Sequence, residues 1–297
     1  MSTLPANYNE IVVDPNTRMD HGLYAFSAAN DRPTGAWPNG AKVAIAVSIN
    51  VDIGDLATEP MNVREFSYRD YGARVGVFRL MQTLDSIGIK ASMPINDLVL
   101  KRTPAVADAA LQRGWELVAH GEKINRVVNS TMSPEDEDKF ISGSFDAIKA
   151  FAGTAPRGWL GPANSESART PLALAKAGFD YTMDWGNDDQ PFDFIVREGR
   201  LSSLPYSADT SDAAVIQAQS HTPWEFEQQL SDHLEGLLDD PRMDGSVMTM
   251  GLQAHVSGQP FRSIYIRKFL EKALASGRVW CATGAEIIDA YRAQKGA

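Results

Sequence analysis

The stretch KVAIAVSINVDIGD, residues 42–55, decides the fold of this chain, because an apolar run ends there in polar and acidic residues. Runs this short, apolar and rich in β-branched residues are typical of strands buried on both faces of a parallel sheet. Similar runs recur along the chain at 89–95, 115–120, 157–161, 179–185, 200–205, 247–255 and 278–282.

The segments between these runs have helical patterns. Apolar residues fall at helical spacing in GVFRLMQTLDSIG (76–88), and residues 133–153 open with Ser133, Pro134 and an acidic first turn, as a capped helix does. Residues 170–178 and 263–277 also read as helices. Strands that alternate with helices pair in parallel through right-handed crossovers. We therefore predict a single (β/α) barrel of about seven or eight strands, with a doubly wound open sheet as the alternative.

Composition excludes several classes of protein. The chain has 297 residues, a net charge of −10, 43% hydrophobic and 22% charged residues, which is a globular composition. The sequence has no cluster of Lys and Arg of the kind that binds nucleic acid, and it has no apolar run as long as a membrane span. We see no secretory signal at the start, and Cys281 has no second cysteine to pair with. We expect a cytoplasmic protein that binds a small molecule and neither nucleic acid nor membrane.

Polar side chains follow the predicted strands at the edge where barrel enzymes carry their sites. Asp52 ends the first run and is a candidate general base. His120 and Glu122 follow the third run, although a core histidine and a surface charge would explain them as well. His255 ends the seventh run and is a candidate proton donor, or simply a loop histidine.

Two further segments are candidates for substrate binding. In RGWLGPANSES (157–167), small residues and hydroxyls could bind a polar ligand, while Trp159 is also easily explained as core. In DYTMDWGNDDQP (180–191), several acids crowd around one tryptophan, which favours a binding role and turn formation about equally. The residues selected from these segments are Trp159, Gly161, Ser165, Glu166, Trp185, Asp188 and Asp189.

Several common catalytic motifs are absent from the sequence. The chain contains no HxxxH, HxH or HExxH pair for zinc, no GxSxG nucleophile elbow, and neither GxGxxG nor a phosphate-binding P-loop. The sequence therefore does not support a function that uses a nicotinamide cofactor or a nucleotide.

Several motifs recur together along the chain: RDYGARVGVFRLMQTLDSIGIKAS (69–92), GWELVAHGE (114–122), PRGWLGPANSES (156–167), TPLALAKAGFDYTMDWGNDDQPF (170–192), LPYS (204–207), HVSGQPFR (255–262) and VWCATGAEI (279–287). In combination they resemble the polysaccharide deacetylase superfamily, and in particular its allantoinase-like branch, which hydrolyses cyclic amides. The similarity extends from residues 18–26 to the last helix. The resemblance implies a deformed (β/α) barrel and a cytoplasmic homo-oligomer, and we expect an N-terminal arm (1–36) followed by the barrel (37–297).

The resemblance also implies where metal ligands would stand. Sugar deacetylases of the superfamily use an Asp-Asp pair, which here reads Asp52-Ile53, and two histidines four apart, which here read His120 and Ile124. The last-strand histidine would fall at Gln253, with His255 two residues on. An isoleucine supplies no lone pair to a cation, and the allantoinase-like branch is described as working without a metal.

We therefore predict a metal-independent hydrolase of a C–N bond in an allantoin-, hydantoin- or imide-like ring. Asp52 would activate water, while His120 and a backbone N–H of residues 161–165 would polarise the carbonyl. Asp188 or Asp189 would orient the ring with Trp159, and His255 would protonate the leaving nitrogen. The alternatives are a metal-dependent deacetylase of N- or O-acetylated carbohydrate, holding one divalent ion such as zinc, and a non-catalytic ligand-binding protein.

Overall fold

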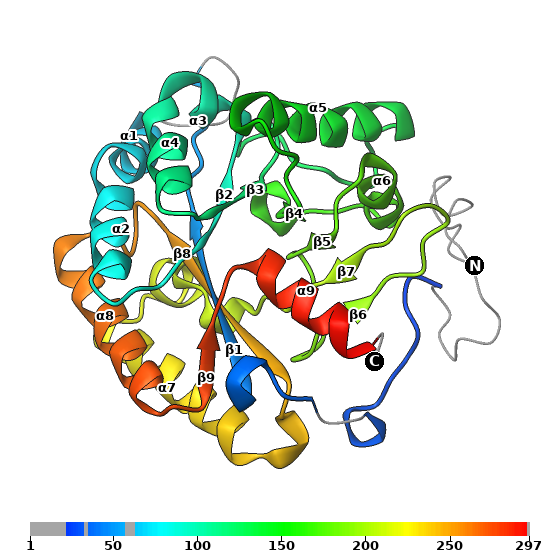
Figure 1. Ribbon diagram of the computed structural model, residues 1–297. Coiled ribbons are helices and arrows are strands. Elements are labelled where there is room, and N and C mark those ends of the chain that lie inside the picture. Colours follow the sequence, from blue (N-terminus) through cyan, green and yellow to red (C-terminus); the bar gives the residue numbers. More distant parts are fainter. Residues whose placement is uncertain (1–21, 33–34, 57–62, 296–297) are drawn as a thin grey trace.

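The computed structural model describes residues 22–32, 35–56 and 63–295, and Figure 1 shows one curled sheet surrounded by helices. The sheet has the strand order β6-β7-β5-β4-β3-β2-β1-β8, and β9 pairs with the first half of β1. The strands are β1 (Val43–Asn50), β2 (Ser92–Ile95), β3 (Glu116–Ala119), β4 (Gly158–Trp159), β5 (Tyr181–Thr182), β6 (Phe192–Asp193), β7 (Ser202–Ser203), β8 (Ser246–Gln253) and β9 (Val279–Cys281).

All the neighbouring strands pair in parallel except β6 and β7, which are antiparallel. Each apolar run of the sequence contains a strand, so the predicted deformed (β/α) barrel in one domain is confirmed. The short antiparallel strand β6 was not predicted, because its two residues sit in a turn-rich segment without an apolar run.

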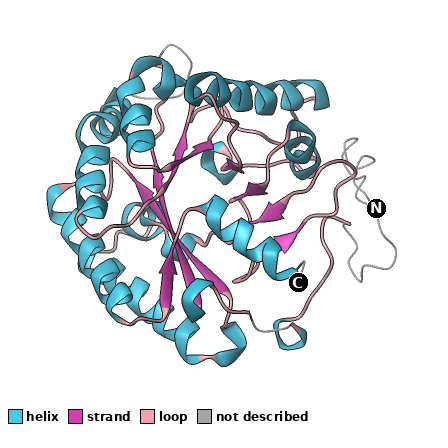
Figure 2. Ribbon diagram, in the orientation of Figure 1, coloured by secondary structure: helices cyan, strands magenta, loops and turns pink. Residues whose placement is uncertain are grey.

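Helices cover the outer surface of the curled sheet (Figure 2). The described helices are α1 (Val63–Tyr71), α2 (Val77–Asp85), α3 (Asp97–Arg102), α4 (Pro104–Gln112), α5 (Pro134–Ala152), α6 (Thr170–Ala177), α7 (Pro223–Asp239), α8 (Pro260–Ala275) and α9 (Gly284–Lys295), of which α9 lies across one end of the barrel. None of the helices within the described ranges is long and apolar enough to cross a bilayer.

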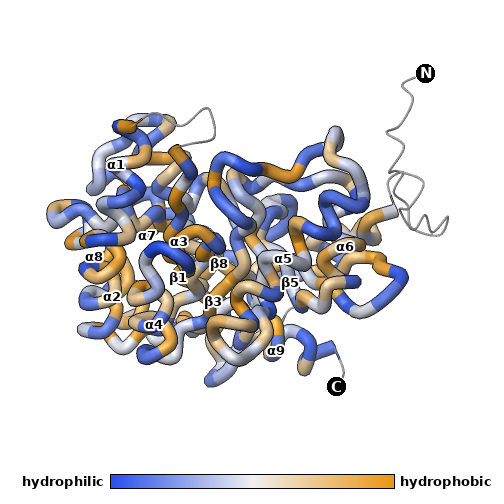
Figure 3. Tube along the Cα trace, turned by 90° about the horizontal axis from the view of Figure 1, so that it is seen from above, coloured by the Kyte–Doolittle hydropathy of each residue, from blue (hydrophilic) through white to orange (hydrophobic). Residues whose placement is uncertain are grey.

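The predicted helix boundaries follow from local chemistry. The Ser133 side chain accepts a hydrogen bond from the Asp136 amide at the start of α5, and Gly153 ends that helix with φ 72°. Helix α8 begins at Pro260, three residues before the predicted start at 263, because Pro260 suits the first helical turn. Along α2 and α8, polar and apolar residues alternate around the helix (Figure 3), as expected for helices with one face on a core.

Side chains on β1 alternate between two cores. Val43, Ile45, Val47 and Ile49 belong to the larger core between the sheet and its helices. Ala44 and Ala46 belong to a smaller core inside the barrel, with Leu160, Tyr181, Val247 and Ile288. Because strand side chains alternate with a period of two, Ser48, Asn50 and Asp52 continue the inner row towards the carboxyl ends of the strands.

Helix α9 lies against the opposite end of the barrel. Its Gly284 amide donates to Ser92 Oγ at 2.9 Å and its Ala285 amide donates to Glu116 Oε2 at 3.0 Å, so the helix begins over the first residues of β2 and β3. The Ile287 and Ile288 side chains of α9 are completely buried and point into the barrel core. The barrel is therefore filled at this end, and only the carboxyl ends of the strands are left to carry a site.

The described part of the predicted N-terminal arm packs on the barrel. The Leu23 carbonyl accepts a hydrogen bond from the Ile195 amide at 2.8 Å. Tyr24 lies edge-on to Trp185, with ring centroids 5.8 Å apart, and also contacts Phe192 and Phe194. The rest of the predicted arm, residues 1–21 and 33–34, lies outside the described residues.

Candidate active site

Asp52 forms the centre of a buried charged cluster at the mouth of the barrel. Its side chain is 2% exposed and forms an ion pair with Arg69, which reaches across from α1. The second carboxylate oxygen lies 3.4 Å from His120 Nε2. Side chains from the end of β1, from helix α1 and from the end of β3 thus meet at one carboxylate.

His120 follows β3, and its orientation is set by the neighbouring strand. Nδ1 lies 2.6 Å from the Leu160 carbonyl oxygen, which only accepts, so Nδ1 carries a proton and donates it there. This contact directs Nε2 towards Asp52. The structure therefore brings together the two residues that the sequence paired, Asp52 and His120.

The surroundings of Asp52 hold it in the ionised form. Burial alone would raise the pKa of Asp52, but Arg69 and His120 together hold it well below its usual range, with a further contribution from His255. A carboxylate with a strongly lowered pKa is a weak proton acceptor. Asp52 is thus better suited to orient Arg69 and His120 than to act as the predicted base.

His255 lies near this cluster, in the loop that follows β8. Gly72 leaves room for it, since a Cβ there would lie 2.8 Å from the His255 backbone nitrogen. Burial lowers the pKa of His255 to about 4, although Asp52 opposes the shift. A ring with this pKa is neutral at pH 7, so it is poorly suited to the predicted role of protonating the leaving nitrogen.

Two partly exposed carboxyl groups, Glu166 and Asp184, form a pair beside this cluster. Trp185 Nε1 donates to Glu166 Oε2 at 2.8 Å. The Thr182 hydroxyl lies 3.1 Å from Glu166 Oε1 and 3.1 Å from Asp184 Oδ2. One hydroxyl hydrogen cannot serve both oxygens, so the geometry calls for a further proton on the pair.

The electrostatics of this pair agree with a shared proton. Burial, followed by the charge of Asp184, raises the pKa of Glu166 well above its usual range. Burial also raises the pKa of Asp184, although hydrogen bonds from Glu166 and the Gly161 amide oppose it. Paired carboxyls of this kind hold one proton between them and can both accept and donate one.

The loop after β4 supports Asp184 instead of presenting free donors. The Gly161 amide lies 2.9 Å from each Asp184 carboxylate oxygen, so the predicted oxyanion donor at this position is already engaged. A Cβ at Gly161 would lie 2.7 Å from the Ser165 carbonyl oxygen, which explains the glycine. The Ser165 hydroxyl donates to the Val128 carbonyl, so it also serves the loop.

Asp212 is a site residue that the sequence did not reveal. Its carboxylate accepts hydrogen bonds from the Gln253 amide at 2.9 Å and from the Ser257 hydroxyl at 2.6 Å. It therefore holds both ends of the loop that carries His255. Burial raises its pKa to about 7. No motif surrounds Asp212 in the sequence, so only the tertiary contacts identify it.

Arg69 was also missed, although it stands in a quoted motif. It lies at the end of an exposed amphipathic helix, where a basic residue is commonplace. Its ion pair with Asp52 spans 17 positions and depends on how α1 packs over the barrel. The sequence gives no direct sign of this ion pair. Only the burial of Asp52, a charge that needs a cationic partner, would have indicated that such a residue must lie nearby.

Trp159 and Glu122 lie outside the charged cluster. Trp159 is completely buried and packs edge-on against Phe140 and Phe179, at centroid distances of 6.1 and 5.6 Å. It is a core residue with no exposed face for a substrate ring. Glu122 forms a surface ion pair with Arg126.

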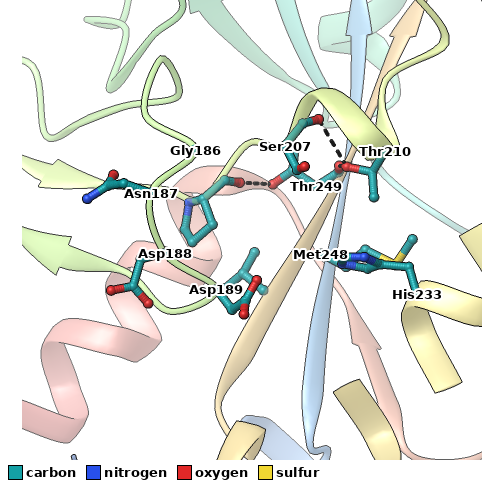
Figure 4. A pocket seen from close by; sticks show the side chains of 11 residues that line it. Gly186, Asn187, Asp188, Asp189, Ser207, Thr210, His233, Met248 and Thr249 are labelled. Carbon is teal, nitrogen blue, oxygen red and sulfur yellow. Dashed lines mark hydrogen bonds between the residues drawn. The ribbon is translucent and has the colours of Figure 1, made fainter. Parts of the chain in front are cut away.

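Asp188 and Asp189 line a separate cavity of about 250 Å³ between the loop after β5 and strand β8. In Figure 4, Asp189 lies on one side of the cavity and His233 of α7 on the other. Asp188 forms an ion pair with Arg32, 2.6 Å between Nη1 and Oδ1. The structure therefore does not bring these two acids to Asp52, contrary to the predicted ring-binding role.

Comparison with known proteins agrees with the resemblance seen in the sequence. A sequence model described as polysaccharide deacetylase matches residues 68–182. A Schizosaccharomyces pombe protein assigned to the polysaccharide deacetylases is 24% identical over 306 residues, covering 88% of this chain and 93% of that protein. Residues 68–182 therefore carry a polysaccharide deacetylase domain, as the resemblance implied.

Solved structures of the superfamily share the fold over almost the whole chain. A Mycobacterium smegmatis protein assigned to the polysaccharide deacetylases has a TM-score of 0.79 and 26% identity, covering 89% of this chain and 95% of that one. An allantoinase has a TM-score of 0.80 and 21% identity, covering 95% of this chain and 98% of that one.

The donor set at the mouth of this barrel does not fit a metal ion. Among the described residues, no group of three or more His, Cys, Asp or Glu side chains is arranged to hold one. Ile53 is 2% exposed and packs in the core between sheet and helices. The Arg69 guanidinium already neutralises Asp52. Two of the implied ligand positions, 53 and 124, are isoleucine and offer no lone pair to a divalent cation. The remaining carboxylate, that of Asp52, already has a positive charge beside it.

Proposed function

We propose that this protein is a hydrolase that opens a C–N bond in a small cyclic amide or imide, such as an allantoin-, hydantoin- or imide-like ring, without a metal. The observation that carries the proposal is the ion pair between Arg69 and Asp52. It places guanidinium N–H donors of the chain itself at a barrel mouth where two implied ligand positions, 53 and 124, are isoleucine. The structural likeness to an allantoinase supports a ring substrate.

The reaction needs a positive charge or hydrogen-bond donors where the carbonyl oxygen becomes negative. Arg69, oriented by Asp52, is suited to that position, and the His120 ring is held beside it. A cyclic amide or imide that is strained or activated makes a smaller demand on the catalyst than a sugar N-acetyl group. The charged cluster therefore favours a ring opening that needs no Lewis acid.

Proton transfer is assigned to the Glu166–Asp184 pair, in place of Asp52 and His255. Its ionised carboxylate accepts a proton from the attacking water as the water oxygen bonds to the ring carbonyl carbon. When the C–N bond breaks, the pair returns a proton to the leaving nitrogen. One pair with a raised pKa can perform both steps, because it gains and then loses one proton in each turnover.

Deacetylation of an acetylated carbohydrate is the second candidate, because the matching sequence model and the yeast relative carry that description. That reaction in this superfamily implies a bound divalent ion. The two functions therefore differ in metal content as well as in substrate.

The experiment combines metal analysis with two substrate panels on the purified protein. We expect less than one metal ion in ten chains, ring opening of a hydantoin or imide followed by loss of ultraviolet absorbance, and rates unchanged by a chelator. Stoichiometric zinc together with chelator-sensitive release of acetate would contradict the proposal and establish the deacetylase. Inactivity on both panels would support a non-catalytic binding protein instead.

A further inference from the structure

Gln253 ends β8 on the inner row of the barrel. Its neighbours in that row face inwards: the Thr249 hydroxyl donates to the Pro205 carbonyl at 2.5 Å, and a Cβ at Gly251 would lie 2.1 Å from the Tyr206 hydroxyl. The alternate residues Met250 and Leu252 pack in the outer core. The Gln253 side chain therefore continues the inner row at the mouth of the barrel.

The position of Gln253 relative to Asp52 follows from strand register. Gln253 pairs with Asn50 on the adjacent strand β1, two residues before Asp52. Neighbouring strands lie about 5 Å apart. Asp52 lies two residues further along its strand, so the Cα atoms of Gln253 and Asp52 are roughly 8 Å apart. A small amide group with a hydrogen bond at its N–H and another at its C=O spans a similar length.

The side-chain oxygen of Gln253 is a buried acceptor that lacks a donor. Oε1 has no hydrogen-bond partner among the described residues, although the residue as a whole is partly exposed. Its backbone is fixed, because its amide donates to both carboxylate oxygens of Asp212, at 2.9 and 3.0 Å. Leaving a buried acceptor unpaired is unfavourable, so such atoms in sites are commonly satisfied by a ligand.

We propose that Gln253 determines specificity by accepting a hydrogen bond, through Oε1, from the ring N–H of the substrate. The inference rests on the proposed function and deepens it. A small cyclic amide holds its N–H and C=O on the same edge, so one edge can face Gln253 and Arg69 together. A ring whose nitrogen carries a methyl group cannot donate this bond. The site therefore selects rings with a free N–H.

The test measures binding by calorimetry, with hydantoin, 1-methylhydantoin and 3-methylhydantoin as probes. We expect methylation of one of the two nitrogens to weaken binding to the wild-type chain roughly tenfold or more, because Oε1 is then left unpaired. Gln253→Met has a side chain of similar length without the acceptor. It should bind the methylated and unmethylated rings within about threefold of one another.

Two further variants keep the comparison interpretable. Gln253→Glu retains an acceptor oxygen and should retain the preference for the free N–H, even if Gln253→Met folds poorly. Gln228→Met makes the same substitution on the exposed face of α7 and should behave like the wild type. Circular dichroism and the unfolding midpoint check the fold of each variant.

Ring opening is followed separately in the same samples, so that the two proposals fail independently. Discrimination in binding without turnover supports the role of Gln253 and contradicts the hydrolase. Turnover with equal binding of all three probes supports the hydrolase and overturns the role of Gln253. Absence of any binding, or equal discrimination by the wild type and Gln253→Met, also overturns it.

Discussion

Arg69 and Asp52 form an ion pair that joins α1 to the end of β1, with side-chain exposures of 18% and 2%. The carboxylate is almost completely buried, so its charge must be balanced by a partner. Here a guanidinium balances it, and a guanidinium also offers several N–H donors in a fixed plane. This relationship links the fold of the chain to the chemistry proposed for it.

Replacing Arg69 tests whether the guanidinium stabilises the reaction. We expect Arg69→Met to lower kcat for ring opening by about a hundredfold to a thousandfold, the usual effect of removing one oxyanion donor. Arg69→Lys should recover part of the loss, because it restores the charge without the planar donor set. Arg74→Met, at a side chain that is 72% exposed, is the matched control. An unchanged kcat in Arg69→Met would remove Arg69 from the mechanism.

Asp52→Asn distinguishes an orienting role from that of a base. Removing the buried anion leaves Arg69 without its partner, which should destabilise the fold by about 3–5 kcal/mol and lower turnover at least tenfold. The acidic limb of the pH–rate profile should persist, because the Glu166–Asp184 pair still titrates. Urea unfolding and kcat/KM as a function of pH measure the two effects. Loss of that limb would identify Asp52 as the base.

Glu166→Gln removes one carboxyl of the proton-sharing pair. We expect turnover to fall by about two to four orders of magnitude, because the amide cannot exchange the proton. Glu198→Gln, in the turn before β7, serves as the control. Full activity in Glu166→Gln would contradict the assignment.

Asp212 predicts a specific pH dependence of stability. Its pKa is raised by burial to about 7 in the folded chain, against 3.8 ordinarily. The folded state therefore binds more protons than the unfolded state between about pH 4 and 7, so this group lowers the free energy of unfolding as pH rises through that window. At 1.36 kcal/mol per pKa unit, the change is about 4 kcal/mol.

Comparison with Asp212→Asn isolates this contribution, because Asn cannot ionise. We expect the difference in unfolding free energy between wild type and variant to change by a few kcal/mol from pH 4 to pH 7, with the variant gaining relative to the wild type. Asp209→Asn, on the exposed turn nearby, is the control. A difference that stays constant with pH would show that Asp212 does not titrate in this range.

The pattern of residues close together in the sequence was sufficient to predict much of the fold. The apolar run that ends at Asn50 and the capped segment after Ser133 are both determined by residues that are neighbours in the chain. The same holds for the side-chain alternation that turns Asp52 inwards. Short segments such as β6 were missed because two residues carry no recognisable period.

The partners of the candidate site could not be predicted in the same way. Arg69 reaches Asp52 only because α1 packs over the barrel mouth, and Asp184 meets Glu166 through the crossover between β4 and β5. Trp159 and Asp188 looked suitable by residue type, yet one is completely buried and the other is paired with Arg32. Residue type indicates what a side chain can do, but burial and neighbours decide whether it does so.

The amino-acid sequence by itself determined the alternation of buried strands and amphipathic helices, and with it a barrel whose polar strand ends carry Asp52, His120 and Gln253. These features depend on periodicity and on residues close together in the chain. Only the tertiary structure decided which charges meet, and therefore which carboxyls keep a proton at neutral pH. The physical reason is that a pKa depends on burial and on charges a few ångströms away, which belong to elements distant in the sequence.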